Sequence, residues 1–221
     1  GAPNGQLDDM NFENVSTIKY LGYLIDNRNN TTAAIKERIQ QGNKAYYANN
    51  QLLKNKTVSR STMKIYETLI RPIVTYGSEV WTFTKENENN LRIFERKVIR
   101  KIFGPIKAGD EYRIRTNEEI EKILGNKDIV RYIKAQRLRW LGHLERMDEA
   151  RLPKRIMKEK IYSTRRKGRP KQRWMDNVME DLRTLKVTNW KQIAQERKRW
   201  RQLVEEAKIH TAVELRGKIG K

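Results

Sequence analysis

The chain has 221 residues, of which 37% are hydrophobic and 34% charged, and its formal net charge is +21. The absence of cysteine excludes disulfides, thiol catalysis and cysteine-ligated zinc, and two widely separated histidines do not form a metal-binding cluster. No apolar run approaches the roughly 20 residues that a membrane span needs. The first residues, GAPNGQLDD, contain no basic and apolar leader, so we expect neither a membrane partner nor a secretion signal.

The first thirty residues predict a small β element. Residues 15–25, VSTIKYLGYLI, are rich in β-branched and aromatic residues, which predicts a strand with Gly22 at a bulge or a close backbone approach. The upstream residues NGQ at 4–6 suit a hairpin turn.

Helical periodicity dominates the rest of the chain. The sequence indicates the boundaries of three helices. The signals are Thr31 and Thr32 as a cap, a start at Ser59 or Ser61, a kink or break at Pro72, a cap at Thr84 and an end at Gly104-Pro105. Further helices are expected over 117–124, about 127–147, 174–184 and 189–207, the last with an Asn189–Gln192 capping pair. In the helix over 127–147, Ile129, Ile133, Trp140 and Leu144 are predicted to point inward, and Arg131, Lys134, Arg137 and Arg139 to line other faces.

The positive charge is concentrated near the C-terminus. Residues 151–221 hold 22 Lys and Arg against 8 Asp and Glu, a net of +14, whereas residues 1–150 hold 26 against 19. Such asymmetry favours a nucleic-acid partner or an anionic membrane surface. Gly168 and Pro170 interrupt the densest basic run, RRKGRPKQRW at 165–174, and would break a membrane-binding helix, so nucleic acid is the favoured partner.

Four segments together resemble one family. They are KYLGYLI at 19–25, RPIVTYGSEVW at 71–81, RLRWLGHLERM at 137–147 and KGRPKQRWMDNV at 167–178. In this order they resemble the C-terminal part of the endonuclease–reverse-transcriptase protein of non-LTR (LINE-type) retrotransposons.

The resemblance implies a mainly α fold of successive parts. Residues 1–30 would be a β-hairpin remnant of the polymerase palm, 31–110 a helical thumb-like domain, and 111–221 a basic helical C-terminal domain with a basic connector at 151–173. An upstream palm domain would be a partner in a full-length protein.

The catalytic centre of that family is not matched. Its aspartate pair lies in a Tyr-x-Asp-Asp strand that binds magnesium, whereas Asp8-Asp9 lies in QLDDM without flanking apolar strands and about ten residues before KYLG. We therefore expect no enzyme activity from this chain alone, and no metal or other cofactor.

The candidate nucleic-acid-binding residues lie in three places. The segment RRKGRPKQR resembles the AT-hook, in which Gly allows close backbone approach, Pro holds an extended path and cations enter a narrow minor groove, although Lys167 replaces the first Arg of that motif. A second group flanks Trp200, which the helical period places in the core, and a third lies off the apolar stripe of the first long helix. The candidates are Arg165, Arg166, Lys167, Gly168, Arg169, Pro170, Lys171, Arg173, Arg197, Lys198, Arg199, Arg201, Lys36, Arg38 and Lys44. The alternative for each is a solvated charged surface.

The predicted function is non-catalytic binding of an RNA–DNA hybrid, RNA or target DNA through phosphate contacts, in the nucleus. The sequence is also compatible with two alternatives. One is a domesticated or truncated copy that acts as a protein-interaction scaffold, and the other is a part of an active polymerase whose palm lies upstream.

Overall fold

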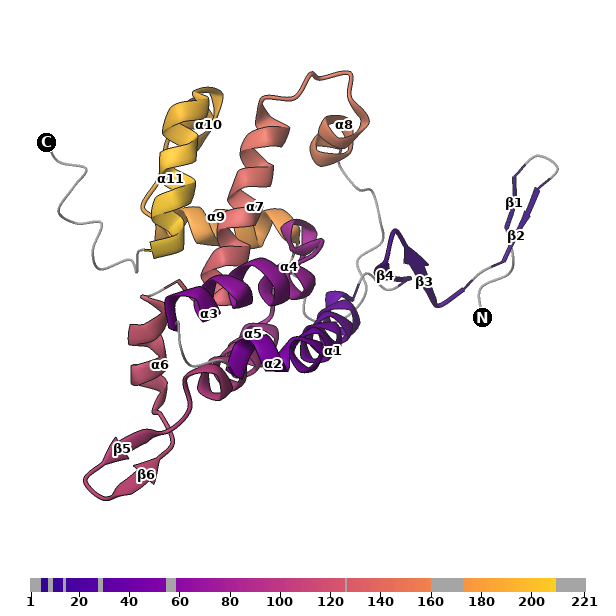
Figure 1. The fold of residues 1–221 in the computed structure, drawn as a ribbon. Coiled ribbons are helices and arrows are strands. Elements are labelled where there is room, and N and C mark those ends of the chain that lie inside the picture. The colour runs from indigo at the N-terminus through magenta and orange to yellow at the C-terminus, as the bar shows by residue number, and fades with distance from the viewer. Residues whose placement is uncertain are drawn as a thin grey trace, which may run out of the picture. The chain divides into compact units, whose positions relative to one another are not determined.

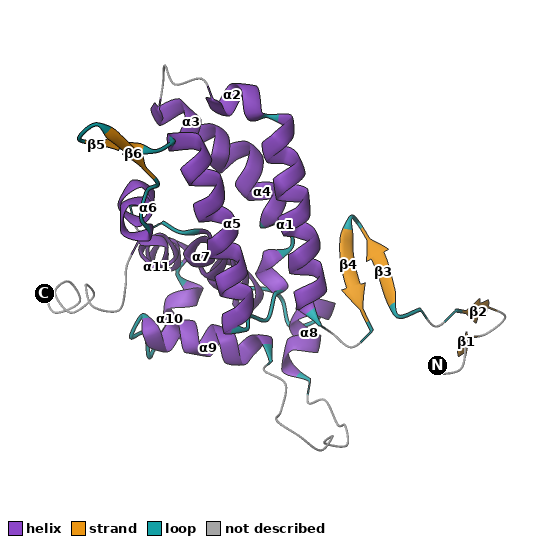
Figure 2. Ribbon diagram, turned by 90° about the horizontal axis from the view of Figure 1, so that it is seen from below, coloured by secondary structure: helices purple, strands orange, loops and turns teal. Residues whose placement is uncertain are grey.

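The structure is a computed structural model that describes residues 5–7, 10–13, 15–27, 30–54, 59–125, 127–159 and 173–209. The described chain is mainly α, with two-stranded antiparallel hairpins, two of them near the N-terminus (Figures 1 and 2). This confirms the predicted fold class. Within these residues, no helix is both long and apolar enough to span a bilayer.

Contacts divide the chain into two compact units, Gly1–Tyr76 and Gly77–Lys221, which are described separately. The division falls after Tyr76, whereas the predicted domains met at residues 30 and 110. The long helix over 85–103, assigned above to the thumb-like domain, accordingly belongs to the second unit.

The first unit begins with two hairpins. Strands β1 (Gly5–Leu7) and β2 (Met10–Phe12) pair with each other, as do β3 (Thr17–Tyr20) and β4 (Tyr23–Asp26). The single strand predicted over 15–25 is therefore wrong, because Leu21 and Gly22 adopt positive φ angles of 47° and 75° and reverse the chain. Two positive φ angles in a two-residue loop match the right-handed twist of a hairpin, and a glycine lowers their cost. The predicted turn over 4–6 is also displaced, since Gly5 and Gln6 lie in β1.

The helices of the first unit follow as α1 (Thr31–Ala48), α2 (Asn50–Lys54), α3 (Ser59–Ile65), the π-helical turn η1 (Tyr66–Ile70) and α4 (Arg71–Val74). Asn30, one residue before the predicted caps, accepts a hydrogen bond from the Thr32 amide at 3.0 Å. Pro72 lies in the first turn of α4. The chain stays helical from Ser59 to Val74, so no break occurs at Pro72 itself, and the irregularity is the π-helical turn η1 just before it. Helix α1 packs against η1 and α4 and buries Ile35 and Tyr46.

The second unit contains the 3-10 turn η2 (Ser78–Val80), α5 (Lys85–Phe103), β5 (Ile106–Ala108), β6 (Glu111–Arg113), α6 (Asn117–Leu124), α7 (Ile129–Glu145), α8 (Leu152–Lys158), α9 (Trp174–Thr184), α10 (Trp190–Gln195) and α11 (Arg197–Ile209). The predicted cap of α5 is confirmed, because Thr84 Oγ1 accepts from the Asn87 amide at 3.2 Å. Gly104 ends α5 and Gly125 ends α6, as predicted. Both glycines adopt positive φ.

Three predictions for this unit are corrected. The segment 189–207 forms two helices instead of one, and the Asn189 side chain makes no cap hydrogen bond. Helix α8 forms inside the connector expected to be irregular. In addition to these three corrections, the structure contains the β5–β6 hairpin, which turns at Gly109 and for which the sequence makes no prediction.

Helix α7 is the centre of the second unit and contacts α5, η2 and α8 to α11 (Figure 1). Its inward positions pack with apolar residues of α9, α10 and α11. Members of this core include Leu138, Leu141, Val178, Leu182, Trp190, Ala194, Trp200 and Val204. The predicted burial of Trp81, Trp190 and Trp200 is confirmed, whereas Trp140 and Trp174 are half-buried.

Candidate nucleic-acid interface

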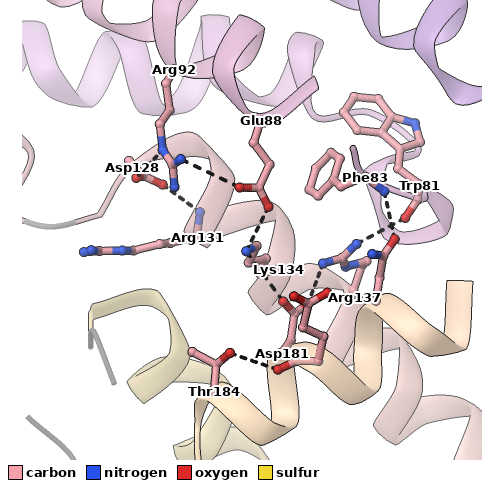
Figure 3. Close-up of polar contacts among 12 residues, drawn as sticks. Trp81, Phe83, Glu88, Arg92, Asp128, Arg131, Lys134, Arg137, Asp181 and Thr184 are labelled. Carbon is pink, nitrogen blue, oxygen red and sulfur yellow. Dashed lines mark hydrogen bonds and ion pairs between the residues drawn. The ribbon is translucent and has the colours of Figure 1, made fainter. Parts of the chain in front are cut away.

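Arg137 of α7 is buried, with 1% of its surface exposed, although the helical period placed it on an outer face. Its Nη2 lies 2.5 Å from Oδ2 of Asp181 on α9, and its Nη1 donates to the Trp81 carbonyl at 3.4 Å (Figure 3). The guanidinium also lies over the Phe83 ring, 4.8 Å from its centroid. The prediction that Arg137 lies on an outer face is therefore wrong. Asp181, 44 residues later in the chain, pairs with the guanidinium and offsets the cost of burying its charge.

The same region holds a wider polar network. Lys134 Nζ lies 2.9 Å from Glu88 Oε1 and 3.7 Å from Asp181 Oδ1 (Figure 3). Burial raises the pKa of the Asp181 carboxyl, and the charges of Arg137 and Lys134 oppose that rise.

Residues from three of the four family-like segments meet in this network. Trp81 and Arg137 share a hydrogen bond, and Asn177 Oδ1 accepts from the Phe83 amide at 2.8 Å. Trp174 Nε1 donates to the Glu79 carbonyl at 2.7 Å. These hydrogen bonds therefore link η2 and the segment after it to α7 and α9 within the second unit.

A close approach between α7 and α11 fixes how these helices lie against each other. A Cβ atom built on Gly142 would lie 2.0 Å from Trp200 Nε1, so the indole occupies the space that a larger residue would fill. The indole nitrogen donates to the Leu138 carbonyl at 2.9 Å. Trp200 lies against Gly142 whereas Glu205, further along α11, pairs with the earlier residue Arg139, so α11 runs antiparallel to α7 (Figure 1).

This packing brings four arginines around one depression of about 380 Å³, which we call the arginine cleft. Trp200 and Val204, both buried, lie beneath it. Its cations are Arg139 and Arg146 of the α7 side and Arg197 and Arg201 of α11. Positions 139 and 146 are two turns apart and 197 and 201 one turn apart, so each pair lies on one helical face.

The arginine cleft holds more positive charge than nearby carboxylates neutralise. Arg139 has an ion pair with Glu205 at 3.8 Å, and both side chains are half exposed or more. Arg197 and Arg201 have no ion pair in the part of the chain that the structure describes. Burial, and next the charge of Arg197, lower the pKa of the Arg146 guanidinium. Like charges held together in this way favour binding of an anion.

Arg146 has a second role in shaping the cleft. It lies at the C-terminal end of α7, where a cation is favoured by the helix dipole, and its Nη1 donates to the Ala194 carbonyl at 2.5 Å. The first turn of α11 begins at Arg197, so the positive end of that dipole faces the same region.

The structure places the predicted C-terminal residues differently from one another. Arg197 and Arg201 join the cleft, whereas Arg199 is exposed and paired with Glu196 at 3.1 Å, and Lys198 is exposed. Arg173 is exposed, and its amide donates to Asp176 at the start of α9. The predicted residues Arg165, Arg166, Lys167, Gly168, Arg169, Pro170 and Lys171 lie outside the described residues.

Two cleft residues, Arg139 and Arg146, were not among the predicted candidates. Their spacing of seven on a predicted helix was visible in the sequence. Nothing local in the sequence shows that this face meets Arg197 and Arg201, because the juxtaposition depends on the contact between Gly142 and Trp200.

The candidates in the first unit are Lys36, Arg38 and Lys44 of α1. Lys36 and Lys44 are exposed. Arg38 donates to the Gly22 carbonyl and lies over the Tyr76 ring, 4.6 Å from its centroid. Tyr76 in turn donates to the Leu21 carbonyl at 2.9 Å. Arg38 therefore anchors the β3–β4 turn on this unit.

Helix α8 shows the reverse of the usual amphipathic pattern. Leu152 and Ile156, one turn apart, are 64% and 61% exposed. Lys154 is buried between them in the chain and donates to the Glu145 carbonyl at 2.7 Å. The outward face of α8 is thus apolar.

No group of three or more histidine, cysteine or acidic residues suited to a metal ion occurs among the described residues. The pair Asp8 and Asp9 lies outside them.

The chain is similar to a protein of Caenorhabditis elegans, F52C9.6, which is named as transposon-derived and uncharacterized. The two are 27% identical over 208 residues, which cover 90% of this chain and 73% of the other. No protein-family model matches the chain, and no solved structure matches it.

Proposed function

We propose that this chain is derived from a transposon and binds nucleic acid without catalysing a reaction, through phosphate contacts in the arginine cleft. The observation that carries the proposal is the convergence of Arg139, Arg146, Arg197 and Arg201 around one depression with Glu205 as the paired carboxylate. The similarity to a transposon-derived protein supports the origin.

The physical basis is the release of counterions from a phosphate chain. Each phosphate that a cation neutralises contributes about 0.9 to the slope of log affinity against log salt for duplex DNA, and about 0.7 for single strands. Arginine is suited to this contact because its planar guanidinium can bind phosphate oxygens in a bidentate manner. The cleft has four arginines, one of them partly neutralised. This site alone should therefore give a slope of log affinity against log salt with a magnitude of about 3.

The order of the four family-like segments supports a more specific proposal about the kind of transposon. We propose that the chain corresponds to the C-terminal part of a LINE-type reverse transcriptase, with an upstream palm as its partner and the nucleus as its location. In that setting the ligand would be an RNA–DNA hybrid, RNA or target DNA.

The test compares the loss of two cations from the arginine cleft with the loss of two exposed cations elsewhere in the second unit. The double variant Arg197→Gln/Arg201→Gln should weaken binding to a mixed-sequence oligonucleotide and lower the salt slope by about 1.4 to 1.8. The matched control is Lys122→Gln/Arg183→Gln, which removes the same charge from exposed positions of α6 and α9. Equal losses of slope in the two double variants would contradict the proposed site.

The apolar face of α8 favours a second function, that of a protein-interaction scaffold. Leu152 and Ile156 are flanked by the exposed cations Arg151 and Arg155, a combination suited to an acidic amphipathic helix. A synthetic helix of that kind, titrated with the full chain, should bind and should lose binding to Leu152→Ser/Ile156→Ser. No saturable binding by the unaltered chain would remove this alternative.

A further inference from the structure

A second stripe of side chains on α7 adjoins the arginine cleft. It consists of Trp140 and His143, which lie three residues apart on one face of α7, and of Met147, two residues beyond the end of the helix at Glu145. The Trp140 and His143 rings lie 5.3 Å apart between centroids with their planes inclined by 34°. His143 is exposed, and Trp140 is half-buried.

The stripe and the cleft share a border. His143 and Met147 line a second depression together with Arg146, Arg151 and Arg197. Arg146 and Arg197 also line the arginine cleft, so the same two cations separate the cleft from the stripe. Asp148, which lines the second depression too, accepts a hydrogen bond from the Ala150 amide at 2.8 Å.

We propose that the site takes single-stranded nucleic acid, with phosphates in the arginine cleft and unpaired bases stacked on Trp140 and His143. The inference deepens the proposed function and rests on it. A base can stack on an aromatic side chain only when the flat face of the base is not covered by a neighbouring base. Because every base has such a face, stacking recognises single strands of any sequence. In a duplex the base faces are covered by neighbouring base pairs, and the stripe would have nothing to bind.

The dimensions of the site suit a short length of one strand. Arg139 and Arg146 are seven residues apart, which corresponds to about 10 Å along a helix at 1.5 Å per residue. The α7 side of the cleft is therefore long enough to contact a short stretch of one sugar–phosphate chain. Adjacent aromatic and cationic side chains on a short track are the combination that single-strand-binding proteins use.

The experiment measures the affinity of the full chain for a single-stranded DNA, the same sequence as RNA, and the duplex DNA, at two salt concentrations. The unaltered chain should bind either single strand at least tenfold more tightly than the duplex. His143→Ala and Trp140→Leu should each weaken single-strand binding by about fivefold or more, with the salt slope and the duplex affinity unchanged. The matched control is Tyr112→Ala, which removes an exposed aromatic side chain on β6.

The outcomes separate this inference from the proposed function. Suppose that Arg197→Gln/Arg201→Gln lowers the salt slope but the Trp140 and His143 variants leave single-strand affinity unchanged. Single-strand recognition would then be overturned and phosphate binding would stand. The same conclusion would follow if the unaltered chain bound duplex and single strand with equal affinity. An unchanged slope in the arginine variant would overturn both. Because His143 is exposed, His143→Ala keeps the test valid even if Trp140→Leu unfolds the second unit.

Discussion

Trp200 fills the space that a side chain on residue 142 would need, since a Cβ there would lie 2.0 Å from its Nε1. The indole also donates to the Leu138 carbonyl, one turn before Gly142 on α7. Together the glycine and the indole set both the distance between α7 and α11 and their register. The register is what places Arg197 and Arg201 opposite Arg139 and Arg146.

Gly142→Ala should therefore damage stability and the arginine cleft together. An added methyl group in a packed interior costs about 1 to 3 kcal/mol, and here the nearest atoms belong to a large and fully packed ring. We expect a lower urea midpoint for the second unit, and a smaller salt slope of nucleic-acid binding because the helices must separate.

A second substitution distinguishes a clash from a general helix effect. Gly142→Ala/Trp200→Leu removes the ring that the methyl group meets, so the two substitutions should be coupled and the double variant less destabilised than the sum of the single variants. Additive losses would show that Gly142 is required for a reason other than this contact.

Much of the helical layout could be predicted because its signals are local. Thr84 as a cap and Gly104 as an end of α5, and Gly125 at the end of α6, act within one turn of the residues that they terminate. The β5–β6 hairpin has strands of three residues each, too short for alternation to be visible. The pattern over 17–26 predicts a single strand instead of a hairpin because the turn contains Leu21, a residue type that rarely adopts positive φ.

The cleft and the buried pair could not be predicted, because they depend on residues distant in the sequence. Periodicity assigns a charged residue to the surface, and it has no means of detecting that Asp181 will meet Arg137 in the core. In the same way, a basic run around Trp200 identifies Arg197 and Arg201 as candidates, but the opposing pair on α7 becomes a site only after the helices pack.

Arg137→Met should destabilise the second unit strongly. Removing one partner of a buried ion pair leaves the other charge uncompensated and typically costs about 3 to 5 kcal/mol. Lys134, at 3.7 Å from Asp181, would compensate in part. The measurement is the free energy of unfolding from urea titration.

The matched variant for this prediction is Arg137→Met/Asp181→Leu. It replaces both charges with apolar side chains of comparable size, so the unpaired carboxylate disappears and most of the lost stability should return. A double variant that is as unstable as Arg137→Met would mean that the hydrogen bond to Trp81 and the stacking on Phe83 carry the stabilisation instead.

Glu119 should make the stability of the second unit depend on pH in the acid range. Its hydrogen bond with Arg113, and next its acceptance of the Thr116 amide proton, lower its pKa from 4.5 to about 2. A carboxyl with a lowered pKa in the folded state contributes stability that is present above its unfolded pKa and is lost as the pH falls towards about 2. The urea midpoint of the unaltered chain should therefore exceed that of Glu119→Gln at pH 6, and the difference should shrink between pH 4.5 and 2.

Arg113→Ala tests the cause of that shift. It removes the larger influence on Glu119 and keeps the capping interaction with Thr116, so the loss of stability should begin at a higher pH than in the unaltered chain. An unchanged acid profile in Arg113→Ala would show that the cap alone holds the pKa of Glu119 low.

Glu205→Gln should strengthen nucleic-acid binding, in contrast to every substitution of a cleft arginine. Glu205 lies 3.8 Å from Arg139, and it also binds Lys208 at 2.7 Å, so part of its charge is directed at the cleft. The interaction with Lys208 is the main reason that the pKa of Glu205 is lowered, and the carboxylate is therefore charged at neutral pH. Its removal frees Arg139 to bind phosphate, and we expect affinity to rise a few-fold at low salt and the salt slope to increase by up to about 0.9.

The matched control is Glu206→Gln, the adjacent exposed carboxylate, which makes the same change in net charge. If Glu206→Gln raised the slope as much as Glu205→Gln, the gain would come from net charge alone, and Arg139 would not be a phosphate-binding residue.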